Sequence, residues 1–220
     1  MKNWSGFGPV LFALLATASA AFASQQTNTL AQATLTAQHM KTDPAFGSAR
    51  NMLSQARGVL IIPRLVKAGF IFGAESGDGV LVGKTPTGWS DPAFFSMSSA
   101  SFGLQLGLEK AEIVMLIMND KALNAVQNGD FKFGAGAGLT VATLSGGAAA
   151  GNLAGDILVW TSGTGAYGGL TLNGSSIRPR YDWNTEFYGR PVGIPDILVG
   201  NVQNPNSNQL QAALNTLGRG

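Results

Sequence analysis

A run of short apolar segments separated by glycines, from Gly58 to Met118, most constrains what this chain can fold into. Short apolar runs bounded by glycine and turn residues are typical of β-strands. Thr85-Pro86-Thr87-Gly88 predicts one turn between strands, and Gly77-Asp78-Gly79 predicts a tight hairpin turn. The segment therefore predicts an antiparallel β-meander.

Longer strands are expected on either side of a turn at Glu109-Lys110, over residues 94–108 and 111–118. Residues 131–143 alternate between apolar and small or polar side chains, which predicts another strand. Further strands are expected at 157–161 and 167–172.

Four helices flank or interrupt these strands. Apolar residues at helical spacing predict the first at 25–40, and Asp43-Pro44 is a strong start for a second that Gly58 would end. The other two are expected at 119–127 and 206–217.

Glycine at alternate strand positions is tolerated where a sheet curls tightly or where two backbones come close. We therefore predict an α+β fold: a curled, nearly closed antiparallel sheet, barrel-like, with helices packed on it at the N-terminus, the middle and the C-terminus. The alternative is a transmembrane barrel, which the uneven strand lengths and the interrupting helices disfavour.

The first residues predict the compartment. Lys2 precedes an apolar run, and Ala21-Phe22-Ala23 resembles a signal-peptidase site, so we expect a signal peptide at 1–23. An uncleaved anchor is the alternative, but the apolar run is shorter than the roughly 20 residues of a membrane span. The domains expected are this leader, an N-terminal helix at 24–42 and one domain at 43–220. The predicted location is periplasmic or secreted.

Charge and residue content exclude several classes of function. Lys and Arg number 14 against 12 Asp and Glu, so any anion binding must come from local clustering, and a nucleic-acid-binding face is not expected. The chain has no cysteine and one histidine, His39, which we interpret as a solvated helix residue. Glu109 and Glu112 are interpreted as solvated charges beside a turn. Gly163 to Gly168 matches GxGxxG, but a strand is expected where a nucleotide site needs a helix.

These observations predict a protein without catalytic residues, metal, cofactor or nucleotide. We expect no concave pocket that brings two titratable groups together.

Basic residues lie beside apolar and aromatic ones in two segments. Arg64 and Lys67 follow an apolar run, and three arginines lie close to Trp183 and Tyr188: Arg178, Arg180 and Arg190. Arginine beside aromatic rings suits a membrane interface, where guanidinium pairs with phosphate. The alternative is an ordinary surface loop in which the arginines pair with Asp182 and Glu186.

Several short motifs, taken in order, resemble the SYLF domain, a lipid-binding family of bacteria and eukaryotes. They run from Lys67-Ala68-Gly69-Phe70 through Gly88-Trp89-Ser90-Asp91-Pro92 to Phe187-Tyr188-Gly189-Arg190 and Ile194-Pro195-Asp196. Eukaryotic members resemble phosphoinositide-binding modules. The resemblance implies affinity for anionic phospholipid, and it covers roughly residue 43 to the C-terminus.

The function expected is therefore non-enzymatic binding of anionic phospholipid headgroups, peripherally at a bacterial envelope membrane. The predicted contacts are Arg64, Lys67, Arg178, Arg180 and Arg190, with Trp183 and Tyr188 as interfacial aromatic residues. Lys67 is expected to head a strand face with little side-chain cover, where its ammonium reaches a ligand or a neighbouring carboxylate. The alternative function is a structural envelope protein that self-associates through sheet edges into a homo-oligomer.

Overall fold

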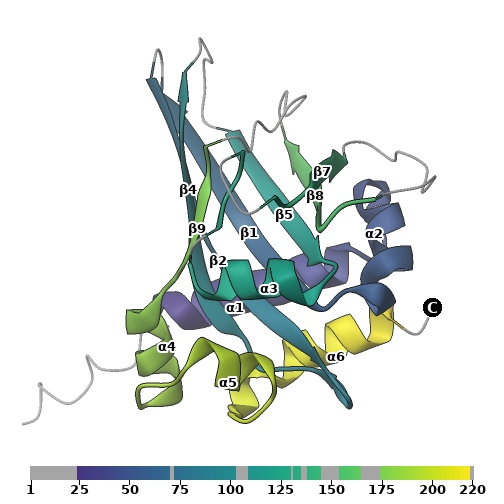
Figure 1. Cartoon of the computed structure of the whole chain (residues 1–220), viewed down its shortest axis with the longest axis vertical. Helices are drawn as coiled ribbons and strands as arrows, with labels where there is room; N and C mark the ends of the chain where they lie inside the picture. Colours follow the sequence, from purple (N-terminus) through teal and green to yellow (C-terminus); the bar gives the residue numbers. More distant parts are fainter. Residues whose placement is uncertain are drawn as a thin grey trace, which may run out of the picture.

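A computed structural model of the chain describes residues 24–69, 72–102, 109–129, 131–134, 138–144, 154–164 and 174–218. Over these residues the predicted α+β architecture is confirmed, with helices packed on a strongly curled sheet (Figure 1). The expected leader at 1–23 and the expected strand at 167–172 lie outside the described residues.

One sheet of nine strands forms the centre of the described fold. Its order is β6-β9-β4-β2-β1-β5-β8-β7, with β3 paired to β2, and every pair is antiparallel except β7 with β8. The strands are β1 (Gly58–Gly69), β2 (Phe72–Thr85), β3 (Gly88–Trp89), β4 (Ala93–Phe102), β5 (Glu109–Ile117), β6 (Phe131–Lys132), β7 (Val141–Leu144), β8 (Ile157–Thr164) and β9 (Ser176–Pro179).

The turn expected at Gly77-Asp78-Gly79 is wrong, because β2 runs straight through these residues. The glycines serve close approach instead. A Cβ on Gly79 would lie 2.3 Å from the Ile61 carbonyl oxygen, and one on Gly77 would lie 2.7 Å from the Arg64 carbonyl oxygen. The neighbouring strand β1 carries one extra residue between Ile61 and Val66, which changes its register with β2. Glycine thus accommodates a β-bulge rather than a hairpin.

Two other strand predictions need correction. Glu109 and Lys110 do not form a turn, since they begin β5 and pair with β1. The strand expected over 131–143 is two short strands, β6 and β7, which lie at opposite edges of the sheet. Gly134 and Gly138 have φ angles of 77° and 54°, which an extended strand cannot contain. The alternating pattern therefore predicted a longer strand than the structure contains.

The helices match the sequence where caps are clear. Asp43 and Asn119 accept hydrogen bonds from Ala45 and Ala122 as N-caps, and the four predicted helical regions are present. The second is broken into short turns, and Gly58 begins β1 rather than ending a helix. Two short helices, α4 and α5, were not predicted.

The helices are α1 (Gln25–His39), α2 (Gly47–Met52) between the 3-10 turns η1 (Pro44–Phe46) and η2 (Leu53–Gln55), α3 (Asp120–Gln127), α4 (Tyr181–Tyr188), α5 (Ile194–Leu198) and α6 (Asn208–Leu217), preceded by η3 (Pro205–Ser207).

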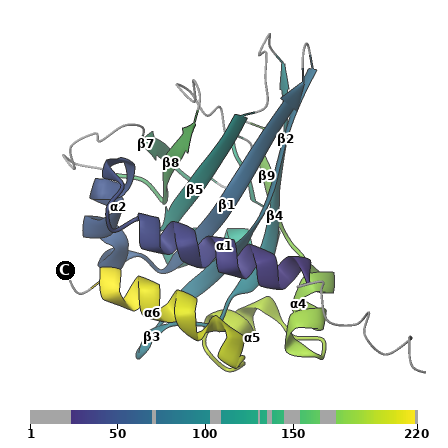
Figure 2. The same ribbon diagram turned by 180° about the vertical axis from the view of Figure 1, so that it is seen from behind.

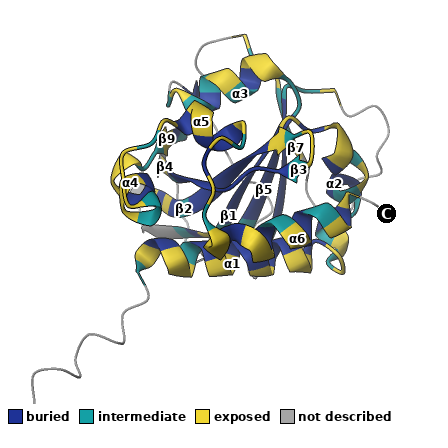
Figure 3. Cartoon of the chain, turned by 90° about the horizontal axis from the view of Figure 1, so that it is seen from below, coloured by how far each residue is buried: buried dark blue, intermediate teal, exposed yellow. Residues whose placement is uncertain are grey.

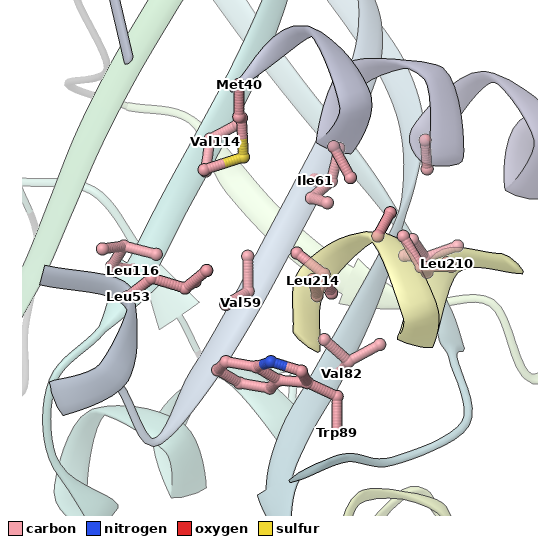
Figure 4. Close-up of a cluster of buried hydrophobic side chains, with 14 of the residues drawn as sticks. Met40, Leu53, Val59, Ile61, Val82, Trp89, Val114, Leu116, Leu210 and Leu214 are labelled. Carbon is pink, nitrogen blue, oxygen red and sulfur yellow. The ribbon is translucent and has the colours of Figure 1, made fainter. Parts of the chain in front are cut away.

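Helices cover both faces of the sheet, and each face has its own hydrophobic cluster. Helices α1 and α6 lie against one face, and α3 and α5 lie on the other (Figure 3). In β1, Val59 and Ile61 face the first cluster while Leu60 and Ile62 face the second. Figure 4 shows Val59 and Ile61 beside Leu210 and Leu214 of α6. This burial on both faces explains the continuous apolar runs in the central strands.

Helix α1 lies across β1 and β2 and is held by a polar contact at each end (Figure 2). At its start the Gln26 side chain donates to Glu186 of α4 over 2.5 Å, and near its end Thr36 donates to Glu112 of β5 over 2.8 Å. No helix in the described part of the chain is long and apolar enough to cross a bilayer.

Candidate functional site

A face rich in serine lies on strands β4, β9 and β6, with exposed positions on each strand. Phe95, Met97 and Ile177 are buried in the second hydrophobic cluster. Because side chains alternate along a strand, their neighbours lie on the opposite face. We call this surface the β4–β9 face; its members are Ser96, Ser98, Lys132, Ser176 and Arg178.

Strand register brings two cations together on the β4–β9 face. Arg178 lies directly opposite Ser96, and Ser176 lies opposite both Ser98 and Lys132. Lys132 and Arg178 are therefore diagonal neighbours, a relation in which Cα atoms stand roughly 7–8 Å apart. Both side chains are exposed, and neither has an ion-pair partner among the described residues. The hydroxyls of Ser98 and Ser176 lie 3.3 Å apart beside them.

Arg180, just after β9, is in a different state from Arg178. Its guanidinium donates to Asp78 over 2.9 Å and to both carboxylate oxygens of Asp182, and it stacks on the Trp183 ring at 4.0 Å. The hydrogen bond from Arg180 holds the pKa of the Asp182 carboxyl below its usual range. Arg180 therefore lies at the end of the β4–β9 face that follows β9, and its charge is neutralised by Asp78 and Asp182.

The two aromatic residues predicted at a membrane interface take part in packing. Trp183 is 7% exposed and meets Phe94 edge-on, with ring centroids 6.0 Å apart. The Tyr188 hydroxyl donates to the Pro92 carbonyl oxygen, and burial raises the pKa of this phenol. These contacts anchor α4 to β4, and a membrane role for either ring stays a prediction.

Lys67 lies in register between two acidic residues. It is opposite Glu75 of β2 on one side and Glu109 of β5 on the other. Residues directly opposite in an antiparallel pair share a face, and Glu75 is only 2% exposed. The contact predicted for Lys67, with a ligand or with a neighbouring carboxylate, stays a prediction.

Arg64 lies in the bulge of β1 and lines a pocket of about 480 Å³ between α1 and the sheet. The same pocket contains His39, Asp43, Glu112 and Ser162, so the expectation of no pocket with converging titratable groups is wrong. His39 and Glu112 are not simply solvated either, because Nδ1 of His39 lies 3.2 Å from a Glu112 oxygen. The Ser162 hydroxyl donates to Asp43. Among the described contacts, therefore, the serine and the histidine have different carboxylate partners and do not activate each other.

The structure separates the five predicted basic residues. Arg178 and the bulge with Arg64 are three strands apart, a spacing of about 14 Å at the usual distance between strands. Arg190 is exposed just beyond α4, where Gly189 ends the helix. Within the described residues, register places a second exposed cation, Lys132, close to Arg178. Lys132 could not be predicted from the sequence, because nothing local to β6 shows that β9 will be its neighbour.

The described residues contain no group of three or more His, Cys, Asp and Glu side chains that could hold a metal ion. The β4–β9 face brings together exposed cations and hydroxyls, which can donate hydrogen bonds to an anion.

The described fold is a curled α+β sheet covered by helices, with a polar face at β4 and β9. The family described as "Ysc84: Las17-binding protein actin regulator" matches residues 98–217, more than half of the chain. The chain therefore belongs to the Ysc84 family, also called SYLF, and the family resemblance seen in the sequence is confirmed.

Full-length relatives are considerably longer than this chain. "SH3 domain-containing YSC84-like protein 1" of Bos taurus is 29% identical over 164 residues, covering 70% of this chain and 47% of the relative. The Pongo abelii protein of the same name is 30% identical over 162 residues, with 70% and 46% covered. "LAS seventeen-binding protein 3" of Saccharomyces cerevisiae strain S288c is 28% identical over 194 residues, with 83% and 42% covered. The chain thus spans about half the length of these relatives. No solved structure matches it.

Proposed function

We propose that this protein is a non-enzymatic membrane-binding protein that recognises anionic phospholipid headgroups through the β4–β9 face. The observation that carries the proposal is the exposed pair Lys132 and Arg178, set among serine hydroxyls with no acidic partner in the described residues. Lipid binding is also what the SYLF resemblance implies.

The chemistry of the face suits a phosphate group. Guanidinium donates two parallel hydrogen bonds to phosphate oxygens, and ammonium adds a mobile point charge. Serine hydroxyls can donate to the remaining oxygens. Because Arg180 forms ion pairs with Asp78 and Asp182, these two carboxylates compete little for the cations of the face. Each basic residue near an anionic surface contributes about 1 kcal/mol, which salt screens.

The other predicted residues have secondary roles in this proposal. Arg64 and Arg190 are exposed and add long-range attraction, whereas Arg180 orients the loop before α4. Lys67 lies outside the β4–β9 face, in register with Glu75 and Glu109, and its contact with lipid stays a prediction.

We further propose a peripheral location at a bacterial envelope membrane, on its periplasmic side. The signal-peptide pattern at 1–23 supports this location.

Vesicle sedimentation tests the proposal. The protein is mixed with vesicles of phosphatidylcholine alone, or with added phosphatidylglycerol, cardiolipin or phosphatidylinositol phosphate. We expect binding only to anionic vesicles, and a loss of roughly 5- to 30-fold for Lys132→Gln with Arg178→Gln. The matched control is Lys41→Gln with Arg57→Gln, which removes the same charge away from the face. Equal binding to neutral and anionic vesicles, or equal losses for the two double variants, would contradict the proposal.

Sedimentation velocity of the same samples addresses the alternative function. A stable oligomer that is indifferent to vesicle composition would favour a self-associating structural protein over a lipid-binding one.

A further inference from the structure

A second site, unrelated to the charged face, lies where α6 meets the β2–β3 hairpin. A pocket of about 580 Å³ lies there, and a second of about 230 Å³ continues from it past the hairpin. Both pockets are lined by Trp89 and Asn215 and by the hairpin loop residues Pro86 and Thr87. Together they form an elongated groove along α6, which we call the α6 groove.

Side-chain amides dominate the wall of the α6 groove. Asn208, Gln211 and Asn215 are spaced three and four residues apart, so they lie along one side of α6, and Gln203 precedes them. The opposite side of the helix carries its buried residues, Leu210, Ala213, Leu214 and Leu217. The amide row is therefore a separate feature from the apolar stripe that holds the helix in place.

Most of these amides have unused hydrogen-bonding capacity. The Gln211 amide nitrogen donates to the Trp89 carbonyl oxygen over 3.1 Å, which fixes the side chain and leaves its oxygen free. Within the described part of the chain, the side chains of Gln203, Asn208 and Asn215 have no hydrogen-bond partner. Each such amide presents both a donor and an acceptor.

The described lining of the α6 groove carries one base and one acid. Lys84 lines the smaller pocket, where its ammonium lies 4.4 Å from the centroid of the Trp89 ring. The larger pocket has no lysine or arginine in its described lining. Its one acid, Asp91, is 4% exposed and already accepts from the Ser207 hydroxyl and the Asn204 backbone amide. The formal charges of Lys84 and Asp91 offset each other, and the remaining polar side chains are mostly amides, which suit a neutral ligand that alternates donors and acceptors.

We propose that the α6 groove binds an extended, uncharged peptide segment of another protein through its backbone. Asn208 and Asn215 are about 10 Å apart along the helix axis, the length that three residues of extended chain cover. Backbone N–H and C=O groups are the natural partners of side-chain amides. Val199, which is 61% exposed, and Pro86 and Pro205 provide apolar contacts at the rim for the peptide's side chains.

Peptide display on the full chain tests this inference. A phage library of random heptapeptides is panned against the protein, with counter-selection on Asn208→Asp combined with Asn215→Asp. We expect uncharged sequences to be enriched, and their synthetic forms to lose at least 10-fold in affinity for that double variant. N-methylation of a central backbone amide should cost a comparable factor. The control is Asn206→Asp with Gln209→Glu, two exposed neighbours outside the groove, which should bind as the wild type does.

Three results would overturn the inference. The first is that no peptide is enriched over the counter-selection. The second is that the enriched peptides bind the groove variant as well as they bind the wild type. The third is that maltotriose, but not peptide, shifts the side-chain amide NMR signals of Asn208 and Asn215. The NMR measurement uses the wild type, so it decides even if a variant folds poorly. Vesicle binding should be the same for the groove variant and the wild type, which keeps this test independent of the lipid proposal.

Discussion

The two ends of the central sheet differ in how their faces are covered. At the lower end, residues 59–62 of β1 are buried on both faces between helices. At the upper end of β2 and β4, Ala74, Ser76 and Ser98 are exposed on one face, while Glu75 and Met97 are buried on the other. The central sheet is thus buried on both faces at one end and exposed on one face at the other.

The bulge in β1 lies at the boundary between these ends. Below it α1 and α6 supply apolar cover, and beyond it the outward positions become serine, alanine and charged residues. In the proposed function, the lipid-binding face lies where the helix cover ends. Substitutions at the covered end should cost stability and spare binding, whereas those at the open end should do the reverse.

The largest expected effect is on the bulge. Gly79→Ala should destabilise the protein by about 3 kcal/mol or more, because its Cβ would meet the Ile61 carbonyl at 2.3 Å. Urea unfolding measures this. The control is Gly189→Ala, where nothing lies within 4 Å and only the φ of 68° is unfavourable, at about 1 kcal/mol. Equal losses for both would show that β1 and β2 can separate at the bulge.

The second-largest loss of stability is expected when the charge of Lys67 is reversed. Lys67→Glu would place a third acidic residue in register with Glu75 and Glu109. Like charges directly opposite each other in a sheet are destabilising, so we expect a loss of about 2 kcal/mol in unfolding free energy. Lys67→Glu combined with Glu75→Lys should restore part of it. A variant of normal stability but weak vesicle binding would instead return Lys67 to the lipid site.

A comparable or smaller loss of stability is expected from a substitution where α4 packs on β4. Asn184 is fully buried, accepts from the Phe94 amide over 2.8 Å and donates to the Phe94 and Arg180 carbonyls. Asn184→Ala should therefore lower the unfolding free energy by about 2 kcal/mol, because it leaves buried backbone groups without hydrogen-bond partners. Thermal unfolding with the exposed neighbour Thr185→Ala as control checks this. If vesicle binding falls more than stability does, α4 itself contributes to the lipid site.

A pH-dependent loss is expected at Asp156. Its carboxylate accepts from the Thr140 backbone amide, from Asn119 and from the Thr140 hydroxyl, and the first of these is the main reason that its pKa is lowered. A lowered folded-state pKa stabilises the fold above the unfolded value of about 3.9, and this is lost as pH falls through the folded pKa. Asp156→Asn should cost about 1–2 kcal/mol at pH 7.

Urea unfolding from pH 7 to pH 3 measures the gap between wild type and Asp156→Asn. The gap should narrow in the acid range, and a gap that is constant over this range would assign the loss to packing alone.

The smallest expected effect on stability belongs to the open end. Arg178→Glu should change the unfolding free energy by less than about 0.5 kcal/mol, since the side chain is exposed and unpaired in the described structure. Anionic-vesicle affinity should nevertheless fall. Arg180→Glu is the contrast: it breaks the contacts to Asp78, Asp182 and Trp183, and should lower stability as well.

Local chemistry explains which elements could be predicted from the sequence. The caps Asp43 and Asn119, the Pro86-Thr87 turn and the apolar stripe of α6 each satisfy hydrogen bonds or bury residues within a few positions along the chain. Helix α4 was missed because its cover for β4 depends on Asn184 reaching Phe94, 90 residues away.

By itself, the sequence determined the α+β class, the curl implied by its glycines and the family to which the chain belongs. It also marked Arg178 as a binding candidate. Only the tertiary structure decided that Gly77 and Gly79 accommodate a bulge, that Lys132 lies beside Arg178, and that Arg180 is neutralised by Asp78 and Asp182. The physical reason is that strand register sets which distant side chains meet, and register is fixed by packing across the whole sheet.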